Sequence, residues 1–333
     1  MQSGVTMAPA RVARLHRGAA RARTDRASAL SPRPVLALRS AEDVAGIRRA
    51  GALVAEALAT AECACVPGAT TAAIDDAVRT TMQRAGGEPI FLGYLGTAAS
   101  NIHANAPFPA SSCVSVNEEL VHGVPGARVI GEGDLVSIDA GVRLDGWCAD
   151  SAVTVRVGAS ENRDELDALV DCAQAMLNHA IAAIRPGRRW SEIANGMEAI
   201  AADADFAIAV DFVGHGIGRE LHESPQVPSC VSAGFLRGGD FTLRPGMVLA
   251  IEPMVVLERT RRDSNGERLN PRVKLASDGW TVLVESGARS CHVEHTVAVT
   301  RDGAEVLTVS NSTATTPINQ RVVRAAHSAR LAS

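Results

Sequence analysis

Residues 133–155, which read GDLVSIDAGVRLDGWCADSAVTV, decide the fold. Two apolar segments flank Asp145-Gly146, a dipeptide typical of a two-residue hairpin turn. With that turn, Asp139 on the first strand faces residue 152 on the second, and Asp150 is the diagonal neighbour on the same face. In an apolar sheet, two converging carboxylates repel one another unless a cation neutralises them, which favours metal coordination. Two solvated acids on a hairpin are the alternative at this point.

Two features of the sequence occur twice: a strand block that ends in a carboxylate, and the pair of helices that precedes it. Gly133-Asp-Leu-Val-Ser-Ile-Asp139 has a counterpart in Gly246-Met-Val-Leu-Ala-Ile-Glu252, and each is a short apolar strand that ends in a carboxylate. Two helix pairs, each joined at a Pro-Gly dipeptide, are expected at 40–65 and from 70 onward, and at 164–184 and 190–202. Two helix pairs and two strand blocks at nearly one offset indicate an internally duplicated α+β domain with pseudo-twofold symmetry. Chance coincidence is the alternative.

Composition divides the 333 residues into a folded middle and two flanking segments. Residues 1–39 hold eight arginines against one acid, Asp25, and show no sustained apolar period, which predicts a disordered Arg/Ala-rich extension. A transit peptide, a ribosome-contacting basic arm and a variable extension are all consistent with it. Residues 311–333 are rich in Ser, Thr, Asn and Ala, and we expect a flexible C-terminal tail. The folded domain is therefore predicted to span residues 40–310.

The same composition excludes several classes of protein. The net charge is −4 and basic residues gather at the two ends, so the acidic middle does not suit DNA. No apolar run approaches the length of a membrane span. Seven cysteines, an odd number without a CxxC pair, indicate neither a disulfide framework nor a thiolate zinc site. We therefore expect a cytoplasmic protein. We also expect a monomer, although composition does not determine the oligomeric state.

Further candidate metal ligands lie outside the hairpin. His215 stands between glycines, where the backbone can approach a ligand closely. Glu252 closes the second strand block, and Glu294 opens a later apolar strand. Together with Asp139 and Asp150, these residues supply four carboxylates and one neutral imidazole, whose charge balances two divalent cations. Such a donor set suits a dinuclear centre of Mn, Fe, Co or Zn.

A set of short motifs places these residues in a known context. The motifs are Val121-His-Gly-Val-Pro125, Ser137-Ile-Asp139, Ala149-Asp150, Gly214-His-Gly-Ile-Gly218, His222-Glu223, Ile251-Glu-Pro253, Asp278-Gly-Trp-Thr281 and Glu294-His-Thr296. In combination they resemble the type I methionine aminopeptidases, members of the pita-bread metallopeptidase superfamily, over residues 40 to about 308. The resemblance implies a pita-bread catalytic domain, an antiparallel sheet covered by helices. It also implies that the metal ligands are Asp139, Asp150, His215, Glu252 and Glu294, with Asp150 and Glu294 spanning both metals.

The resemblance further implies an enzyme that removes the N-terminal methionine from peptides and nascent proteins, preferably before a small second residue. Two divalent cations would acidify a water molecule that attacks the first peptide carbonyl. Glu252 would shuttle the proton, His222 would donate to the tetrahedral oxyanion, and His122 would contact the scissile-bond nitrogen. The pocket for the methionine side chain would draw on Tyr94, Phe108, Cys113, Leu221 and Trp280. Core packing is the alternative for Tyr94 and Trp280.

The sequence departs from the family pattern near the expected pocket. Residues 97–107 intervene before the Phe108-Pro109 pair, and Leu221 stands where an aromatic residue is more usual, so the second-residue preference stays open. Two other functions also stay open. An X-Pro aminopeptidase or prolidase shares the fold and the five ligands, but it normally carries an additional amino-terminal domain that residues 1–39 cannot supply. A non-catalytic scaffold paralogue would have lost its ligands, and here all five are present.

Overall fold

In the computed structural model, the residues described are 36–96, 106–264, 266 and 268–309. The predicted extension lies outside the described residues except for residues 36–39, and the predicted tail lies outside them entirely. Of the insertion at 97–107, only residues 106 and 107 are described. No helix in the described part of the chain is long and apolar enough to cross a membrane.

The two predicted helix pairs are present, and the two helices of the first pair begin after residues whose side chains cap them. The first helix follows Ser40, whose hydroxyl accepts a hydrogen bond from the Asp43 amide while the Asp43 carboxylate accepts one from the Ser40 amide. The second follows Thr70, whose hydroxyl accepts from the amide of Ala73. The helices are α1 (Ala41–Ala64), α2 (Thr71–Arg84), α3 (Arg163–Ala183), α4 (Trp190–Asp203) and α5 (Ala233–Gly238).

Among the described residues, nine strands form one antiparallel sheet. Its order is β1-β4-β5-β16-β9-β7-β8, with β2 also paired to β4 and β17 to β16. These strands are β1 (Glu88–Pro89), β2 (Cys113–Val116), β4 (Leu135–Leu144), β5 (Trp147–Arg156), β7 (Gly214–Gly216), β8 (Glu223–Val227), β9 (Val248–Ile251), β16 (Glu294–Val299) and β17 (Ala304–Val306).

Shorter strands form three small sheets beside the main one. Their orders are β15-β10-β6, β13-β14-β3 and β11-β12. The strands are β3 (Glu119–Val121), β6 (Ala207–Ile208), β10 (Met254–Val256), β11 (Arg261–Arg262), β12 (Arg268–Leu269), β13 (Val273–Leu275), β14 (Val282–Val284) and β15 (Ser290–His292). The last of these strands ends two residues before β16 begins, so the chain passes from a small sheet directly into the main one.

The strand order is symmetric about the junction between β5 and β16. The hairpin of β4 and β5 lies on one side, and the antiparallel pair of β9 and β16 lies on the other. In the chain, α1 and α2 precede the first pair of strands, and α3 and α4 precede the second. The predicted internal duplication is therefore confirmed.

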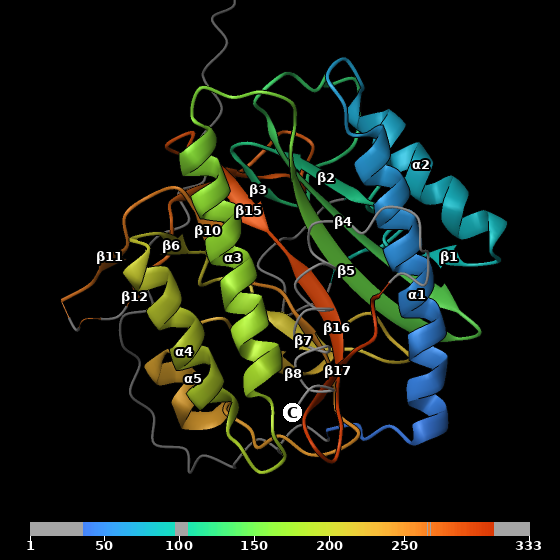
Figure 1. Cartoon of the computed structure of the whole chain (residues 1–333), viewed down its shortest axis with the longest axis vertical. Coiled ribbons are helices and arrows are strands. Elements are labelled where there is room, and N and C mark those ends of the chain that lie inside the picture. Colours follow the sequence, from blue (N-terminus) through green and yellow to red (C-terminus); the bar gives the residue numbers. More distant parts are fainter. Residues whose placement is uncertain (1–35, 97–105, 265, 267, 310–333) are drawn as a thin grey trace, which may run out of the picture. The chain divides into compact units, whose positions relative to one another are not determined.

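The paired helices cover one face of the main sheet (Figure 1). α1 packs on β4 and β5, and a Cβ atom added to its Gly46 would lie 2.3 Å from the Trp147 ring. α3 and α4 share an apolar cluster with Cys291 and Val293. Because side chains alternate along a strand, Asp150 on β5 and Glu294 on β16 point to the opposite face. The helices therefore build the core and leave the other face to polar residues.

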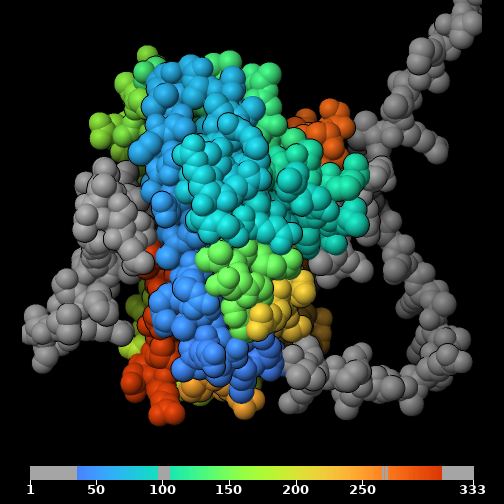
Figure 2. Space-filling model, turned by 90° about the vertical axis from the view of Figure 1, so that its right-hand side faces the viewer, coloured from blue at the N-terminus to red at the C-terminus, as the bar shows by residue number. Residues whose placement is uncertain are grey.

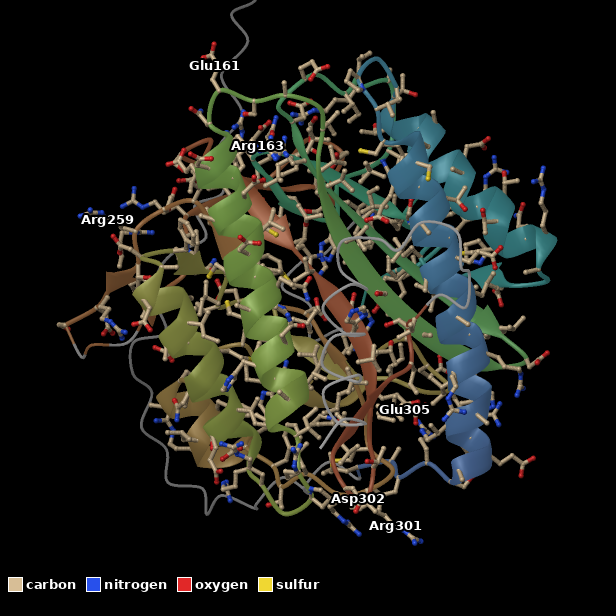
Figure 3. The ribbon with its side chains drawn as sticks, in the orientation of Figure 1. Glu161, Arg163, Arg259, Arg301, Asp302 and Glu305 are labelled. Carbon is tan, nitrogen blue, oxygen red and sulfur yellow. The ribbon has the colours of Figure 1, made fainter. Side chains whose placement is uncertain are left out.

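α1 and α2 pack against each other and form much of the surface in Figure 2. Ile47, Val54 and Ile74 are fully buried beneath them. At its outer side, α1 is tied to β17, because the Arg48 guanidinium donates to Glu305 over 2.6 Å and 3.1 Å. Glu305 points toward α1 in Figure 3. Charged contacts thus tie the first helix to β17, while apolar contacts join it to α2.

Residues 36–39 lie against the domain, although the sequence places them in the predicted extension. The Arg39 amide donates to the Gly246 carbonyl at 2.7 Å, and the Arg39 guanidinium forms an ion pair with Glu223. Leu36 packs against the apolar cluster of α3 and α4. Packing of the domain therefore begins before residue 40. Composition does not reveal this boundary, because the partner of Arg39 lies far along the chain.

Candidate metal centre

The hairpin of β4 and β5 forms with the predicted register. Asp145 and Gly146 occupy its turn with positive φ angles of 51° and 75°. Asp139 pairs with Ala152, and Asp150 stands two residues from Ala152 on the same strand. The predicted convergence of Asp139 and Asp150 on one face of the sheet is therefore confirmed.

Glu294 reaches the same face from β16. Its cross-strand partner on β5 is again Ala152, so Asp139, Ala152 and Glu294 form one row across three strands. The hydroxyl of Thr296 links the two central strands, because it accepts from the Asp150 amide at 3.0 Å and donates to the Asp150 carbonyl at 2.7 Å. The three carboxylates are thereby gathered on strands whose spacing is fixed by backbone and hydroxyl hydrogen bonds.

β7 and β9 supply the other side of the site. His215 pairs with Ala250, and Glu252 follows two residues later. The glycines beside His215 accommodate neighbouring backbone, where the sequence suggested a close ligand. A Cβ at Gly214 would lie 2.3 Å from the Ala250 carbonyl oxygen, and one at Gly216 would lie 2.4 Å from a carbonyl oxygen of β8. Tight strand packing, possible only without those Cβ atoms, positions the imidazole.

The imidazole of His215 stands among the carboxylates. Its Nε2 lies 3.5 Å from Oε1 of Glu252 and 4.0 Å from Oδ2 of Asp150. One ligand atom from each of Asp150, His215 and Glu294 lies within 4.8 Å of the other two. The Nδ1 atom is 3.0 Å from the Gly216 carbonyl, so Nδ1–H donates there and Nε2 keeps a lone pair. This arrangement suits a histidine that binds a cation through Nε2.

Four carboxylates meet here with too few partners for their charge, of which Asp150 and Glu294 are buried and Asp139 and Glu252 are half-buried. Burial raises the pKa of Asp139, Glu252 and Glu294 well above the ordinary values, and the nearby Asp150 raises them further. Burial also raises the pKa of Asp150 itself, to about 7. Asp139 Oδ1, Asp150 Oδ1 and Glu294 Oε1 have no hydrogen-bond partner among the described residues. Buried oxygens that repel one another and lack donors fit a site for divalent cations.

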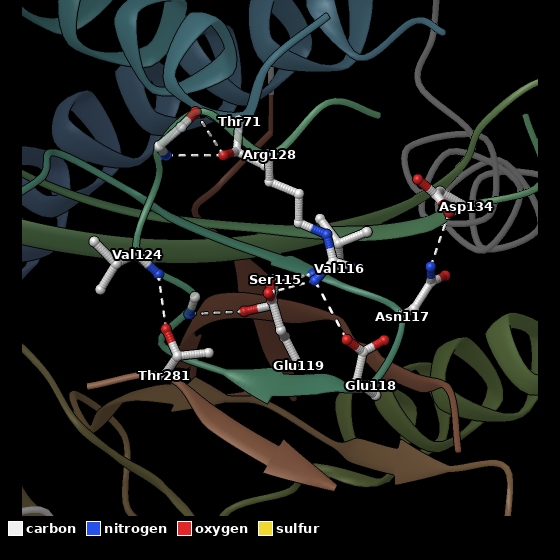
Figure 4. Close-up of polar contacts among 12 residues, drawn as sticks. Thr71, Ser115, Val116, Asn117, Glu118, Glu119, Val124, Arg128, Asp134 and Thr281 are labelled. Atoms are coloured by element: carbon white, nitrogen blue, oxygen red, sulfur yellow. Dashed lines mark hydrogen bonds and ion pairs between the residues drawn. The ribbon is translucent and has the colours of Figure 1, made fainter. Parts of the chain in front are cut away.

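His122 follows β3 on a loop that side-chain hydroxyls hold in place (Figure 4). Its φ of 58° lies in the left-handed region, which a non-glycine residue adopts at an energetic cost. The Gly123 amide donates to Ser115 Oγ at 3.0 Å, and the Val124 amide donates to Thr281 Oγ1 at 3.1 Å. Burial lowers the pKa of His122 to about 4, so its ring is neutral. These contacts maintain a strained backbone that sets the direction of the imidazole.

His222 lies on the loop between β7 and β8, directly beside His215. The two ring centroids are 4.2 Å apart, and Nδ1 of His222 is 2.7 Å from the Tyr94 hydroxyl. Packing around the ring lowers the pKa of His222, and the imidazoles of His215 and His122 lower it further, although part of the side chain is open to solvent. His222 is therefore a neutral group at the edge of the carboxylate cluster.

The residues predicted to form the methionine pocket share one apolar cluster. Phe108 and Trp280 meet edge to face with ring centroids 5.3 Å apart, and Cys113 pairs with Asp139 across β2 and β4. Leu221 belongs to the same cluster, and Tyr94 packs against it. The cluster thus adjoins the carboxylates. Because all but Tyr94 are buried, the pocket role stays a prediction beside the alternative of core packing.

Sequence reasoning missed His292. Its imidazole is 3% exposed, and Nε2 lies 3.6 Å from Oε2 of Glu252. Burial lowers the pKa of His292 to about 3, so the ring is neutral. The signal available in the sequence was its place two residues before Glu294, because the alternation of an extended chain turns both side chains to one face.

The site and fold correspond to those of a known group of enzymes. The model of metallopeptidase family M24 matches residues 45–301, which is most of the chain. The chain belongs to metallopeptidase family M24. It is 38% identical over 287 residues to methionine aminopeptidase 1 of Mycobacterium tuberculosis, covering 84% of this chain and 97% of the relative.

Solved structures agree with this assignment. The methionine aminopeptidase of Thermotoga maritima superposes with a TM-score of 0.71 at 35% identity, covering 82% of this chain and 99% of the other. The prolidase of Pyrococcus horikoshii superposes with a TM-score of 0.59 at 20% identity, over 83% of this chain and 64% of the other. At that identity the prolidase shows the fold alone. The predicted pita-bread fold, an antiparallel sheet covered by helices, is confirmed.

Proposed function

We propose that this chain is a methionyl aminopeptidase, a metallo-hydrolase that removes the N-terminal methionine from peptides and nascent proteins. The observation that carries the proposal is the buried cluster of four carboxylates and His215 beside an apolar cluster, with neutral His122 and His222 close by. Relatives with that activity in their names match nearly their whole length to this chain. A small second residue is the expected preference.

The proposed metal ligands are Asp139, Asp150, His215, Glu252 and Glu294. Their four carboxylates and one neutral imidazole balance two divalent cations, and Mn, Fe, Co and Zn all suit oxygen and imidazole donors. Asp150 lies near the other three carboxylates, since its charge adds to burial in raising the pKa of Asp139, Glu252 and Glu294. We assign Asp150 and Glu294 as the ligands shared by both cations. Bound divalent cations would acidify a water molecule and polarise the peptide carbonyl.

The side chains around the ligands would bind the substrate and move protons. Glu252 has one oxygen toward His215 and the other toward His292, and it would take the proton of the attacking water. His222, neutral and partly open to solvent, would donate a hydrogen bond to the tetrahedral oxyanion. His122 would contact the nitrogen of the scissile bond. The apolar cluster with Tyr94 and Trp280 would receive the methionine side chain.

A peptide assay tests this function directly. EDTA-treated protein is supplied with Mn²⁺, Fe²⁺, Co²⁺ or Zn²⁺ and given Met-Ala-Ser and Ala-Pro peptides, with release of the first residue measured. The proposal requires release of methionine from Met-Ala-Ser with at least one metal and little cleavage of Ala-Pro peptides. Asp150→Asn serves as the inactive control. Cleavage confined to Ala-Pro peptides would favour the prolidase alternative, and no cleavage with bound metal would favour the scaffold paralogue.

The remaining expectations from the sequence stay predictions. None of the seven cysteines forms a disulfide, and a reducing cytoplasm is the compartment that we propose. Ribosome contact through the basic arm, a monomeric state and the lack of DNA binding rest on sequence alone. Mass measurement in solution and co-sedimentation of the full chain with ribosomes would test the first two.

A further inference from the structure

The backbone of His292 is held from two sides, by hydroxyls of β4 and β5 in the main sheet and by β10 in a small sheet. Its amide donates to Thr154 Oγ1 at 3.1 Å and to Ser137 Oγ at 3.3 Å, and its carbonyl accepts from Thr154 Oγ1 at 2.6 Å. The two hydroxyls are themselves 2.8 Å apart. On its other edge, His292 pairs with Met254, two residues after Glu252. Contacts on both sides therefore fix where the imidazole points.

The imidazole itself is left unsatisfied. Its Nε2 is buried and has no hydrogen-bond partner among the described residues. This nitrogen faces the carboxylate of Glu252, whose Oε2 is 3.6 Å away. A buried nitrogen without a partner is costly, and only a small closure would bring this pair into hydrogen-bond distance. Hydrogen bonds at catalytic sites are often long in a free enzyme and shorten in its complexes.

Glu252 is thereby placed between two imidazoles of different character. Its Oε1 faces Nε2 of His215 at 3.5 Å, and its Oε2 faces Nε2 of His292 at 3.6 Å. His215 donates its Nδ1–H to the Gly216 carbonyl, so its Nε2 keeps a lone pair. Among the described residues, the group whose ligand atoms converge consists of Asp150, His215 and Glu294, so the free lone pair of His215 faces two carboxylates. The two histidines are thus suited to different tasks, one to ligation and one to donation.

We propose that His292 is a positioning residue that donates its Nε2–H to Oε2 of Glu252. The bond holds the carboxylate in one rotation, with Oε1 turned toward Nε2 of His215, where it would be available to a bound cation. Because the bond already restricts the Glu252 side chain, less conformational entropy is lost when Glu252 takes up its catalytic position. Outer hydrogen bonds of this kind orient metal-binding carboxylates. The proposal rests on the proposed function, because it concerns the residue assigned as ligand and proton shuttle.

Variants of His292 that differ in side-chain length and in their hydrogen-bond donor distinguish a positioning role from a general structural one. In His292→Gln the side-chain amide extends about as far as Nε2 of histidine and keeps an N–H donor. In His292→Asn the same amide is one methylene shorter and cannot reach Glu252. His292→Met has similar length without a donor, and it repeats the comparison if the Asn variant fails to fold. His179→Asn is the matched control, because His179 on α3 also has an unpartnered Nε2 but belongs to no part of the site.

Each full-length variant is measured in two ways. Mn²⁺ is titrated into EDTA-treated protein by calorimetry, which needs no catalysis, and kcat and KM are determined with Met-Ala-Ser. For His292→Asn and His292→Met we expect a loss of about 10–100-fold in Mn²⁺ affinity or kcat, the usual scale for an outer hydrogen bond to a ligand. KM should stay near the wild-type value, since no substrate contact is removed. His292→Gln should recover most of the loss, and His179→Asn should match the wild type.

Two results would overturn the proposal. Wild-type Mn²⁺ affinity and kcat in both His292→Asn and His292→Met would show that the bond does not matter. Equal impairment of the Gln, Asn and Met variants would show that the imidazole itself is required, as it would be for a metal ligand. The titration also separates this proposal from the proposed function: a wild type that binds Mn²⁺ yet leaves Met-Ala-Ser intact refutes the function, while the calorimetry still decides the role of His292.

Discussion

The hydroxyl of Tyr94 lies 2.7 Å from Nδ1 of His222. Burial, together with the nearby charge of Asp150, raises the pKa of Tyr94 to about 12, so the phenol is protonated and can donate. A neutral imidazole that accepts at Nδ1 carries its proton on Nε2. Tyr94 therefore selects the tautomer of His222 in which Nε2 is a donor, as stabilisation of an oxyanion requires.

Replacement of Tyr94 by phenylalanine tests this link. Tyr94→Phe keeps the ring that packs on the apolar cluster and removes only the hydroxyl. We expect kcat for Met-Ala-Ser to fall by roughly 3–10-fold, the equivalent of one hydrogen bond worth about 0.5–1.5 kcal/mol, with KM nearly unchanged. Tyr94→Leu removes the ring as well and should raise KM. An unchanged kcat in Tyr94→Phe would separate His222 from this tyrosine.

Replacement of Asp150 should impair the metal-loaded enzyme but stabilise the metal-free protein. Asp150→Asn removes a charge that cations need, so kcat should fall by more than the roughly 10–100-fold cost of losing an outer hydrogen-bond partner of a ligand. Without metal, the same change removes repulsion with Asp139, Glu252 and Glu294, so EDTA-treated variant should melt at a higher temperature than EDTA-treated wild type. Asp145→Asn, at the exposed turn of the same hairpin, is the control. Lower stability of the metal-free Asp150→Asn variant would contradict the repulsion.

The stability of metal-free protein should fall toward both ends of the pH range, for two reasons of opposite sign. The folded pKa of Asp150 is about 7, above the ordinary 3.8, and those of Asp139, Glu252 and Glu294 are raised as well, so the folded state holds extra protons that it gives up as pH rises through these values, and stability falls. The folded pKa values of His122 and His215 are about 4, below the ordinary 6.5, so stability falls as pH drops below 6.5.

Melting temperatures of EDTA-treated and metal-loaded protein from pH 5 to 9 test this dependence. Bound cations keep the carboxylates ionised, so the alkaline decline should vanish in the loaded protein. Asp150→Asn should weaken the alkaline decline in metal-free protein. A metal-free melting temperature that rises between pH 6.5 and 8.5 would show that the carboxylate cluster is not strained.

The hairpin register could be derived from sequence because a two-residue turn leaves no freedom. Once Asp145 and Gly146 form the turn, the pairing of Asp139 with Ala152 follows. The helix starts at Ser40 and Thr70 were equally local, since each depends on a side chain that bonds an amide three residues on. Features determined within a few residues were therefore predicted well.

Features that depend on distant partners were not predictable in this way. The pairing of β15 with β10 brings His292 close to Glu252. Arg39 is placed by an ion pair with a carboxylate 184 residues away. The glycines beside His215 were assigned to a ligand, because sequence does not show which neighbouring backbone comes close. For the same reason, the methionine pocket stays a prediction: burial of Phe108 and Trp280 fits both a pocket wall and a core.

Metal counting distinguishes the two histidines that lie side by side. His222→Ala should keep the bound metal and lose about 2–4 kcal/mol of transition-state stabilisation, the scale of one oxyanion donor. His215→Ala removes the metal-binding Nε2 atom from the carboxylate cluster, so this variant should bind less metal and have a lower kcat. Mass spectrometry of the intact loaded protein, beside kcat for each variant, makes the comparison. The assignment is reversed if the His222 variant is the one that empties a metal site.

Arg39 should matter for activity although it precedes the predicted domain. Its guanidinium pairs with Glu223, whose Oε1 also accepts the Arg219 amide at 2.8 Å, so the pair anchors the loop that carries His222. The Arg39 and Glu223 side chains are only 14% and 17% exposed, so Arg39→Ala leaves a partly buried carboxylate short of a donor and should cost about 1–3 kcal/mol of folding stability. We also expect a lower kcat.

Two controls isolate that effect. Arg48→Ala breaks an ion pair whose side chains are 47% and 38% exposed, and it should cost at most about 1 kcal/mol with no change in kcat. Deletion of residues 1–35 removes a segment without an apolar period and should preserve activity on short peptides, whereas deletion of residues 1–39 also removes Arg39 and should reproduce its loss. Denaturant unfolding and kcat are measured for all four proteins. If both deletions behave alike, the anchor at Arg39 contributes nothing to the loop, and the boundary expected from composition is the functional one.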